Sequence, residues 1–311
     1  MKKKNTTFLF AMSVASLVVF APAAVDALTF TPDRLETEVY PGVPVTQELT
    51  LLNEIGSTLS VSLRPVQLDA SGGESGSATF LLNTAGSDSL SWGSVSPSNL
   101  VLKTGEQQAV RVTVTAPDAS SGSLIAGIAA QFRPVRSDET GSIALNAVTG
   151  PYLFARVLSD NSKAEGHLLK FEAAGASSLF SSLPIPLEVT FANSGNVHLA
   201  PTGEIKVVDV FGREVARAEV NAERRIVLPG ITRILPVWWG SEREATSSSW
   251  LREFRKPTVG PFKITAEMTD GISSAVQTSS LTIWVLPWRS ATLLGILILG
   301  VVAAKRRLSV V

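Results

Sequence analysis

The sequence predicts an all-β protein with two tandem immunoglobulin-like β-sandwiches, an N-terminal signal peptide and one C-terminal transmembrane helix. Apolar and polar residues alternate with a period of two in many short segments, including 59–64, 110–115 and 264–268. This is the pattern of a half-buried antiparallel strand. Turn pairs such as the Asp-Gly at 270–271 separate these segments, and no long amphipathic helix interrupts them. Many short strands with regular turns favour sandwiches.

Residues 1–27 have the three parts of a secretory signal. Lysines occupy positions 2–4, an apolar run covers 8–20, and small side chains precede Ala27. The apolar run spans about 20 Å as a helix, which is short of a bilayer core of about 30 Å. We therefore expect cleavage after Ala27, and the alternative is an uncleaved signal anchor.

A weak internal repeat divides the body into a first sandwich at 28–160 and a second at 161–283. In each copy a strand ends in an Asn-containing turn with glycine, at 49–56 and again at 187–195. Later in both copies, an apolar pair and a glycine turn precede another strand. The polar stretch 159–166 is the expected boundary. The alternative is coincidence, because these motifs are short.

The C-terminal segment 284–304 predicts a single-pass helix with an interfacial Trp-Pro-Trp end, and 305–311 predicts a basic cytoplasmic tail. The apolar run 291–304 spans about 21 Å, and a start at Pro287 extends the helix to about 27 Å. The expected membrane-interface residues are Trp284, Trp288, Arg289, Lys305, Arg306 and Arg307. The alternative is a buried C-terminal helix of the body.

Composition excludes several chemistries. Lys+Arg and Asp+Glu number 27 each, so no basic field favours nucleic acid. The absence of cysteine excludes disulfides and thiolate metal sites. The two histidines are His167 and His198, and we expect both to be exposed structural residues. With no nucleotide fingerprint or nucleophile elbow either, we expect no catalysis, no cofactor and no metal.

The tryptophans supply the candidate partner-binding residues. Trp238 and Trp239 are adjacent on a predicted strand, so they point to opposite faces and only one can fill the core. The outward one, beside an arginine-rich loop at 241–256, is a candidate hot spot for protein or glycan. The candidate set is Trp238, Trp239, Trp250, Arg252 and Arg255. The alternative is that the outward tryptophan packs under the loop.

Several motifs resemble the WxL-interacting proteins of Gram-positive cell surfaces. They are residues 92–117 with Ser-Pro-Ser-Asn-Leu at 96–100, Asn-Ser-Gly-Asn-Val-His at 193–198, Leu-Pro-Gly-x-x-Arg at 228–233, and the 284–288 ending. The resemblance implies a signal peptide, two immunoglobulin-like domains, a transmembrane helix and a basic tail. It also implies peptidoglycan binding by the first domain and binding of partner or host proteins by the second.

These observations predict a non-catalytic, membrane-anchored cell-surface protein. Its body lies outside the cell, its tail is cytoplasmic, and it binds a cell-wall glycan such as peptidoglycan, another surface protein, or both. The alternative function is a membrane-tethered extracytoplasmic chaperone or assembly factor that pairs clients with an exposed edge strand. A secreted hydrolase is the third possibility, and it would require a histidine–carboxylate pair in space.

Overall fold

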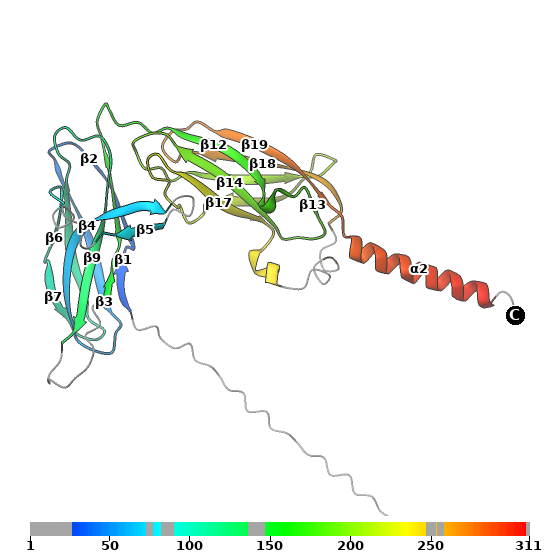
Figure 1. Ribbon diagram of the computed structural model, residues 1–311, viewed down its shortest axis with the longest axis horizontal. Helices are drawn as coiled ribbons and strands as arrows, with labels where there is room; N and C mark the ends of the chain where they lie inside the picture. The colour runs from blue at the N-terminus through cyan, green and yellow to red at the C-terminus, as the bar shows by residue number, and fades with distance from the viewer. Residues whose placement is uncertain are drawn as a thin grey trace, which may run out of the picture.

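The computed structural model describes residues 27–72, 77–81, 90–135, 147–246, 253 and 258–308. The signal peptide expected over 1–27 therefore lies, apart from Ala27, outside the described residues. The described chain is mostly β-strand, as predicted, and it forms two sandwiches followed by one helix (Figure 1).

The first sandwich is built from two facing sheets. One sheet has the order β1-β3-β8-β6 and the other β2-β11-β9-β4-β5, with β10 beside β9 and β7 beside β4. The strands are β1 (Leu28–Thr31), β2 (Arg34–Val39), β3 (Pro44–Asn53), β4 (Leu59–Gly72), β5 (Ser77–Phe80), β6 (Gly93–Ser96), β7 (Asn99–Leu102), β8 (Gln107–Thr115), β9 (Gly122–Pro134), β10 (Ala147–Thr149) and β11 (Tyr152–Val157).

The second sandwich also has two sheets, with the orders β12-β14-β17 and β13-β19-β18-β15-β16. Its elements are β12 (Gly166–Ala173), η2 (Ala174–Ala176), β13 (Leu179–Phe180), β14 (Ile185–Asn193), β15 (Thr202–Val208), β16 (Glu214–Val220), β17 (Thr232–Trp239), η3 (Glu242–Thr246), β18 (Gly260–Thr269) and β19 (Gln277–Val285). Each sandwich has its own apolar core.

Period-two alternation explains these cores. On β8, Val110, Val112 and Val114 are buried, while Arg111 between them is exposed. On β18, Ile264, like the other inward residues, is fully buried. Burying one apolar side chain of this size contributes about 1.5–3 kcal/mol, so a misregistered strand loses several such contributions at once.

The two sandwiches repeat one local device. Asn53 at the end of β3 and Asn193 at the end of β14 are both buried. The Asn53 side chain donates to the carbonyls of Ser57 and Leu102 and accepts from the N–H of Ile55. The Asn193 side chain makes the same three bonds, to residues at matching positions in the second copy. Each asparagine therefore holds the strand end and the following turn together.

The polar stretch expected as the boundary lies between β11 and β12 and is bonded to the second sandwich. The Asn196 side chain accepts from the N–H of Lys163 and donates to the carbonyl of Asn161. A Cβ on Gly195 would lie 2.2 Å from the carbonyl oxygen of Lys163, so only glycine fits there. The linker is thus held against this turn.

The C-terminal helix is α2 (Trp288–Leu308), which extends away from the second sandwich (Figure 1). It begins one residue after the expected start at Pro287. The Glu253 carboxylate accepts bonds from the N–H and hydroxyl of Ser290 in its first turn, where the helix dipole favours negative charge. Within the described ranges, no helix is both long enough and apolar enough to cross a membrane.

Two expectations about this end are corrected. The expected segment 284–304 begins too early, because Trp284 belongs to β19, where it pairs with Pro261 of β18. Its side chain is 54% exposed. The basic residues 305–307 lie in the last turns of α2 rather than in a tail after it, because lysine and arginine are good helix formers and favour a helix C-terminus. The alternative of a buried helix is wrong, since the apolar side chains of α2 are exposed.

Candidate functional site

Several hydrogen bonds join the two sandwiches. Ser123 on β9 accepts at its hydroxyl from the backbone N–H of His198 at 2.8 Å. The same hydroxyl oxygen lies 2.6 Å from the Nδ1 atom of His198. The N–H of Ser123 donates to the carbonyl of Asn196. The Arg34 guanidinium also donates to the carbonyl of Arg224 in the second sandwich.

His198 is buried, with 9% of its surface exposed, so the expectation of an exposed histidine is wrong. The turn that carries it packs on the outer face of β9 and β11, and its ring lies 5.3 Å from that of Phe154. Burial is the main cause that lowers the pKa of His198, and the positive charges of Arg156 and Arg34 contribute as well, so that the pKa is about 4. The ring is therefore neutral near pH 7.

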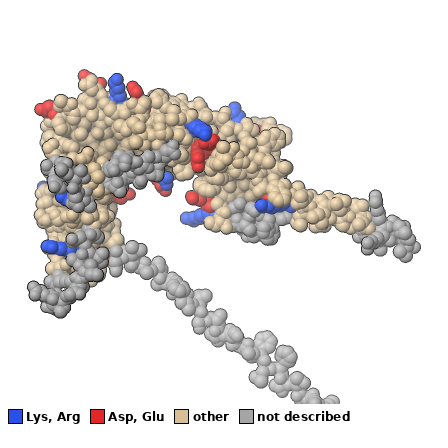
Figure 2. All heavy atoms as spheres, viewed as in Figure 1, with Lys and Arg blue, Asp and Glu red and all other residues tan. Residues whose placement is uncertain are grey.

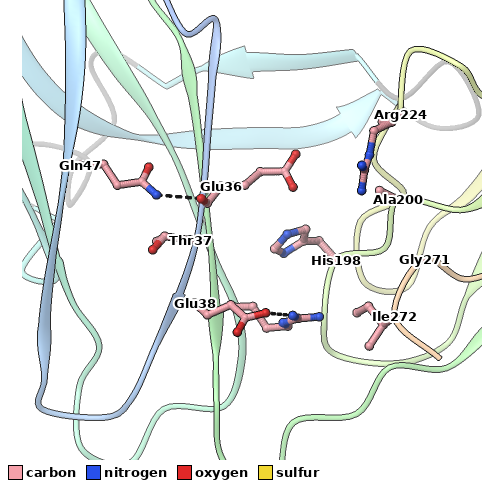
Figure 3. A pocket seen from close by; sticks show the side chains of 10 residues that line it. Glu36, Thr37, Glu38, Gln47, His198, Ala200, Arg224, Gly271 and Ile272 are labelled. Atoms are coloured by element: carbon pink, nitrogen blue, oxygen red, sulfur yellow. Dashed lines mark hydrogen bonds and ion pairs between the residues drawn. The ribbon is translucent and has the colours of Figure 1, made fainter.

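A polar pocket of about 410 Å³ surrounds this histidine (Figure 3). It is lined by Glu36, Thr37, Glu38, Gln47 and Arg156 of the first sandwich and His198, Ala200, Arg224, Gly271 and Ile272 of the second. Most of its charges are already paired. Arg156 pairs with Glu38, and Glu36 pairs with Arg34, which lies just outside the lining. Gln47 donates to the carbonyl of Glu36.

Chemistry in the polar pocket is restricted by this arrangement. A general base works best when its pKa is near the operating pH, and the pKa of His198 is far below it. The Ser123 hydroxyl is occupied by the His198 backbone. The Ser123–His198 pair is thus a bridge between sandwiches. No three His, Asp or Glu side chains gather as a metal site in the part of the chain that the structure describes.

A second pocket of about 450 Å³, the interdomain groove, lies along the same interface. It is lined by Asp33, Arg34, Leu68, Ile125, Gly150, Tyr152 and Phe154 of the first sandwich and Arg225, Ile226, Leu228 and Arg233 of the second. Its lining is mostly apolar with a few charged groups, which is typical of ligand sites between domains.

Strand β11 forms the floor of the groove. Leu153, Ala155 and Val157 point into the first core, while Tyr152 and Phe154 point outward toward the second sandwich. The ring of Tyr152 stacks on that of Phe80 at 6.0 Å and lies 6.3 Å from that of Phe154. Aromatic pairs at these distances are favourable beyond their buried area, so they make a preformed surface.

Arginines of the second sandwich, Arg225 and Arg233, form the wall of the groove. The Arg233 guanidinium donates to the carbonyl of Ile226 at 2.7 Å. Burial lowers the pKa of Arg233, and the nearby positive charge of Arg225 lowers it as well. The Arg225 side chain bonds to Glu223, which is 74% exposed. Two like charges are therefore held close together beside an apolar floor.

No family model matches the chain, and no curated protein matches it either. Similar solved structures include a chaperone–tip adhesin complex of CFA/I fimbriae biogenesis, at 12% identity over 83% of this chain and 98% of that chain, with a TM-score of 0.39. The E. coli chaperone DraB is 13% identical over 82% and 98%, with a TM-score of 0.38. The CsuC–CsuE pre-assembly complex of Acinetobacter baumannii is 13% identical over 83% and 98%, with a TM-score of 0.37.

At these TM-scores no property of those proteins extends to this chain. The resemblance to WxL-interacting proteins stays a prediction.

The two predicted binding tryptophans that the structure describes, Trp238 and Trp239, are not part of the groove lining. Trp239 is 3% exposed in the second core, with its ring 4.9 Å from that of Phe262. Trp238, its neighbour on β17, is half-buried on the opposite face. The other three candidates, Trp250, Arg252 and Arg255, lie outside the described residues. At the other predicted surface, the Arg289 guanidinium stacks over the Trp288 ring at 5.0 Å.

Sequence reasoning missed the groove residues Tyr152, Phe154, Arg225 and Arg233. One signal was present: residues 152–157 are apolar at nearly every position, whereas a half-buried strand alternates. Such a run indicates that the outer face of the strand is covered as well. The arginines carry no comparable signal, since they lie in a turn and at the start of β17.

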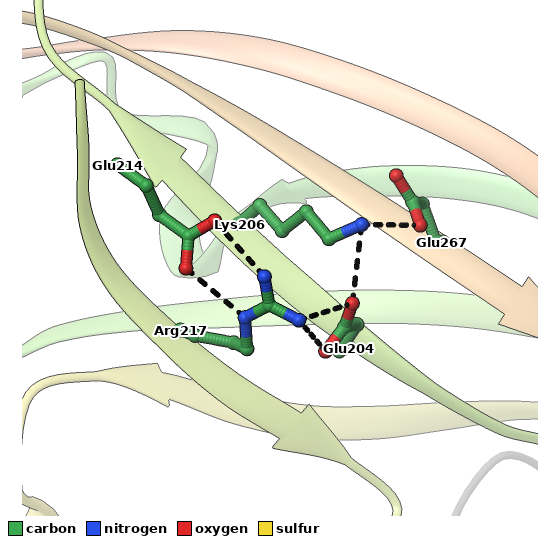
Figure 4. A network of polar contacts seen from close by, with 5 residues as sticks. All are labelled: Glu204, Lys206, Glu214, Arg217 and Glu267. Carbon is green, nitrogen blue, oxygen red and sulfur yellow. Dashed lines mark hydrogen bonds and ion pairs between the residues drawn. The ribbon is translucent and has the colours of Figure 1, made fainter.

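Charged clusters elsewhere are neutralised internally. On the outer face of β15, β16 and β18, Lys206 bonds to Glu267 at 2.7 Å, and Arg217 bonds to Glu204 and Glu214 (Figure 4). Exposed ion pairs of this kind contribute about 0–1 kcal/mol each. Charges of both signs are scattered over the visible face, without a large patch of one sign (Figure 2).

Proposed function

We propose that this chain is a non-catalytic cell-surface protein that binds a segment of another surface protein in the interdomain groove. The observation that carries this proposal is the composition of the groove, with an aromatic floor from one sandwich and an arginine wall from the other. The aromatic floor belongs to the first sandwich and the wall arginines Arg225 and Arg233 to the second, so the groove exists only between the two. Aromatic and arginine side chains are also the residues that dominate binding energy at protein interfaces.

Location is a further part of the proposal. Export by the N-terminal segment would place both sandwiches outside the cell. The apolar side chains of α2 are exposed around the helix, and a helix that is apolar on all sides is stable only when lipid or protein covers it. We propose that lipid covers it, with the basic C-terminal end on the cytoplasmic side.

The chaperone alternative requires an open edge strand, and several edges are blunted. On β12, the Gln277 side chain donates to the carbonyl of Gly166 and accepts from the N–H of Leu168. Gln47 covers the carbonyl of Glu36 on β2 in a similar way. Pro236 interrupts edge strand β17. These devices oppose strand addition, so the groove is the better-supported binding surface.

Photo-crosslinking in intact cells tests the proposal. The full-length chain would carry p-benzoylphenylalanine at Tyr152 or Ile226 in the groove. The control position is Phe211, which is 79% exposed on the β15–β16 turn. We expect protein adducts from the groove positions and none from the control.

Muramidase treatment before irradiation separates the two classes of partner. Adducts that survive the enzyme support a protein partner, and adducts that disappear indicate a wall glycan. The groove proposal fails if no adduct forms at Tyr152 and Ile226, or if Phe211 gives the same adducts.

A further inference from the structure

An exposed row of apolar residues crosses the second sandwich at the end from which α2 extends (Figure 1). Leu179 on β13 pairs with Trp284 on β19, and Trp284 pairs with Pro261 on β18. Paired residues of neighbouring strands lie on the same face of a sheet. Leu179 is 60% exposed and its partner Trp284 is more than half exposed, so this face points outward. We call Leu179, Trp284 and Pro261 the apolar row.

The outer face of this sheet becomes polar with distance from α2. Going back along β19 from Trp284, the outward residues are Thr282, Ser280 and Thr278, and all three are exposed. On β18 the exposed Lys263 pairs with Thr282, one step beyond the apolar row. Aromatic side chains favour the boundary between membrane and water, and a lysine beside it is attracted to anionic lipid. The order apolar, basic, hydroxyl therefore fits a surface whose end rests on a membrane.

The exposed apolar surface continues onto α2. Gly260 pairs with Val285, so Val259 and Leu286 continue the same two strands beyond the apolar row. Both side chains are more than half exposed, and so is that of Trp288, where α2 begins. Apolar side chains are therefore exposed from β13 to the helix that we propose lipid covers.

The junction between the sandwich and α2 is short and bonded. Two residues, Leu286 and Pro287, separate β19 from α2, so the connection spans at most about 11 Å. The N–H of Leu286 donates to the carbonyl of Phe180, and Pro287 is buried. The buried Glu253 carboxylate accepts from Ser290 in the first turn of α2. This end of the sandwich therefore stays close to whatever covers the start of α2.

We propose that this end of the second sandwich lies on the membrane surface, with the apolar row and Val259 in the headgroup region and Lys263 at its outer edge. This rests on the proposed lipid cover of α2. It adds that the sandwich itself contacts lipid and is held with one face toward the bilayer, whereas a loose tether would leave it free to turn.

Single-cysteine labelling of the full-length chain tests the contact, since the chain has no cysteine of its own. Leu179→Cys carries an environment-sensitive fluorophore, in phosphatidylcholine–phosphatidylglycerol vesicles with a nitroxide quencher on the lipid headgroup. We expect this label to lose most of its emission relative to vesicles without nitroxide. Thr278→Cys is the matched control, because it lies on the outer face of the same sheet, about 20 Å from Trp284 along β19. It should lose almost none.

Substitutions assign the contact to the apolar row. Trp284→Ser should restore part of the emission of the Leu179→Cys label, because it removes the aromatic side chain beside that position. Phe211→Ser is the matched control and should restore none, since Phe211 is an exposed aromatic residue on the distant β15–β16 turn. A thermal melt of each variant checks folding. Val259→Cys, outside the strands, keeps the test valid if Leu179→Cys unfolds.

Equal quenching of the Leu179→Cys and Thr278→Cys labels, or no effect of Trp284→Ser, would overturn this inference. A blue-shifted Leu179→Cys emission without quenching would also overturn it, because protein rather than lipid would then cover the row.

A label at Leu297→Cys, with the nitroxide in the acyl chain, separates this inference from the proposed location of α2. Quenching at Leu297→Cys but not at Leu179→Cys or Val259→Cys would leave α2 in lipid and refute the contact of the sandwich. No quenching at any of the three positions would refute the lipid cover of α2 as well.

Discussion

The Nδ1 atom of His198 lies 2.6 Å from the hydroxyl oxygen of Ser123, so the second sandwich is hydrogen-bonded to an inner strand of the first. The two residues are 75 positions apart in the chain. Because the ring is neutral, the serine hydrogen is assigned to Nδ1, while the hydroxyl oxygen accepts from the His198 backbone. This contact and the Arg34–Arg224 bond both join the two sandwiches.

Replacing Ser123 with alanine should loosen the interface. The change leaves the buried Nδ1 and N–H of His198 without their partner, which costs about 1–3 kcal/mol. We expect a lower melting temperature and faster proteolysis in the 158–165 linker. Ser177→Ala is the control, since the Ser177 hydroxyl bonds within its own exposed turn. Similar effects of both substitutions would contradict a bridging role for Ser123.

Acid should weaken the folded arrangement through His198. Its pKa is about 4 in the folded chain against an ordinary value of 6.5, so the unfolded chain takes up the proton first as pH falls. The free energy of unfolding should therefore decrease between pH 6.5 and 4, by at most about 3 kcal/mol, and the His198 contribution should not vary above pH 7.

The measurement is denaturant unfolding across this pH range for the native chain and His198→Asn, whose side-chain oxygen can replace Nδ1 as acceptor. The difference in free energy of unfolding between the native chain and His198→Asn should change with pH only below about pH 6.5. His167→Gln is the control, because His167 is exposed on β12. An unchanged slope in His198→Asn would refute this linkage.

The tryptophan pair should separate stability from binding. Trp239→Ala removes a buried aromatic side chain and should destabilise the second sandwich by about 3–5 kcal/mol. Trp238→Ala should cost less, because its side chain is half-buried on the opposite face. If Trp238 is a hot spot, binding should weaken by about 2 kcal/mol or more. Thermal melts and titrations decide this, and equal large destabilisation would exclude a binding role for Trp238.

The repeated asparagine device should report on each sandwich separately. Asn53→Ala leaves the buried carbonyl of Leu102 and the part-buried carbonyl of Ser57 without their donor, and Asn193→Ala leaves two buried carbonyls without theirs. Each change should cost about 1–3 kcal/mol. Hydrogen exchange should show the loss in β3 and β8 for Asn53→Ala and in β14 and β17 for Asn193→Ala. Loss across both sandwiches from either change would show that they do not unfold as separate units.

A charge in the middle of α2 should release the chain if lipid covers this helix. Leu297→Arg places a guanidinium among the exposed apolar side chains, at a cost of about 2.5–3.5 kcal/mol in a bilayer centre. Carbonate extraction of membranes should recover more of this variant in the soluble fraction than of Leu297→Ile. Protease added to intact cells should remove the body and spare a C-terminal tag. A protected body would contradict the proposed orientation.

Much of the β-architecture could be predicted from the sequence. The strand segments at 59–64, 110–115 and 264–268 fall in β4, β8 and β18. The alternation of apolar and polar residues along a strand shows which face of that strand is buried in its own sandwich, and the pattern is contained within a few neighbouring residues. The Asn turns of the two copies were also visible, because asparagine and glycine favour such turns wherever they occur.

The interface between the sandwiches and its groove were decided by tertiary structure alone. The bonded pair His198 and Ser123 and the groove residues Arg233 and Tyr152 come from distant segments, and nothing in the neighbourhood of any one of them indicates the others. The sequence by itself determined that strands form and which side of each is apolar, because side-chain period and turn chemistry act over a few residues. Only the packing of the second sandwich on β9 and β11 decided that a histidine is buried and that two arginines face an aromatic floor, because such contacts depend on how two complete domains fit together.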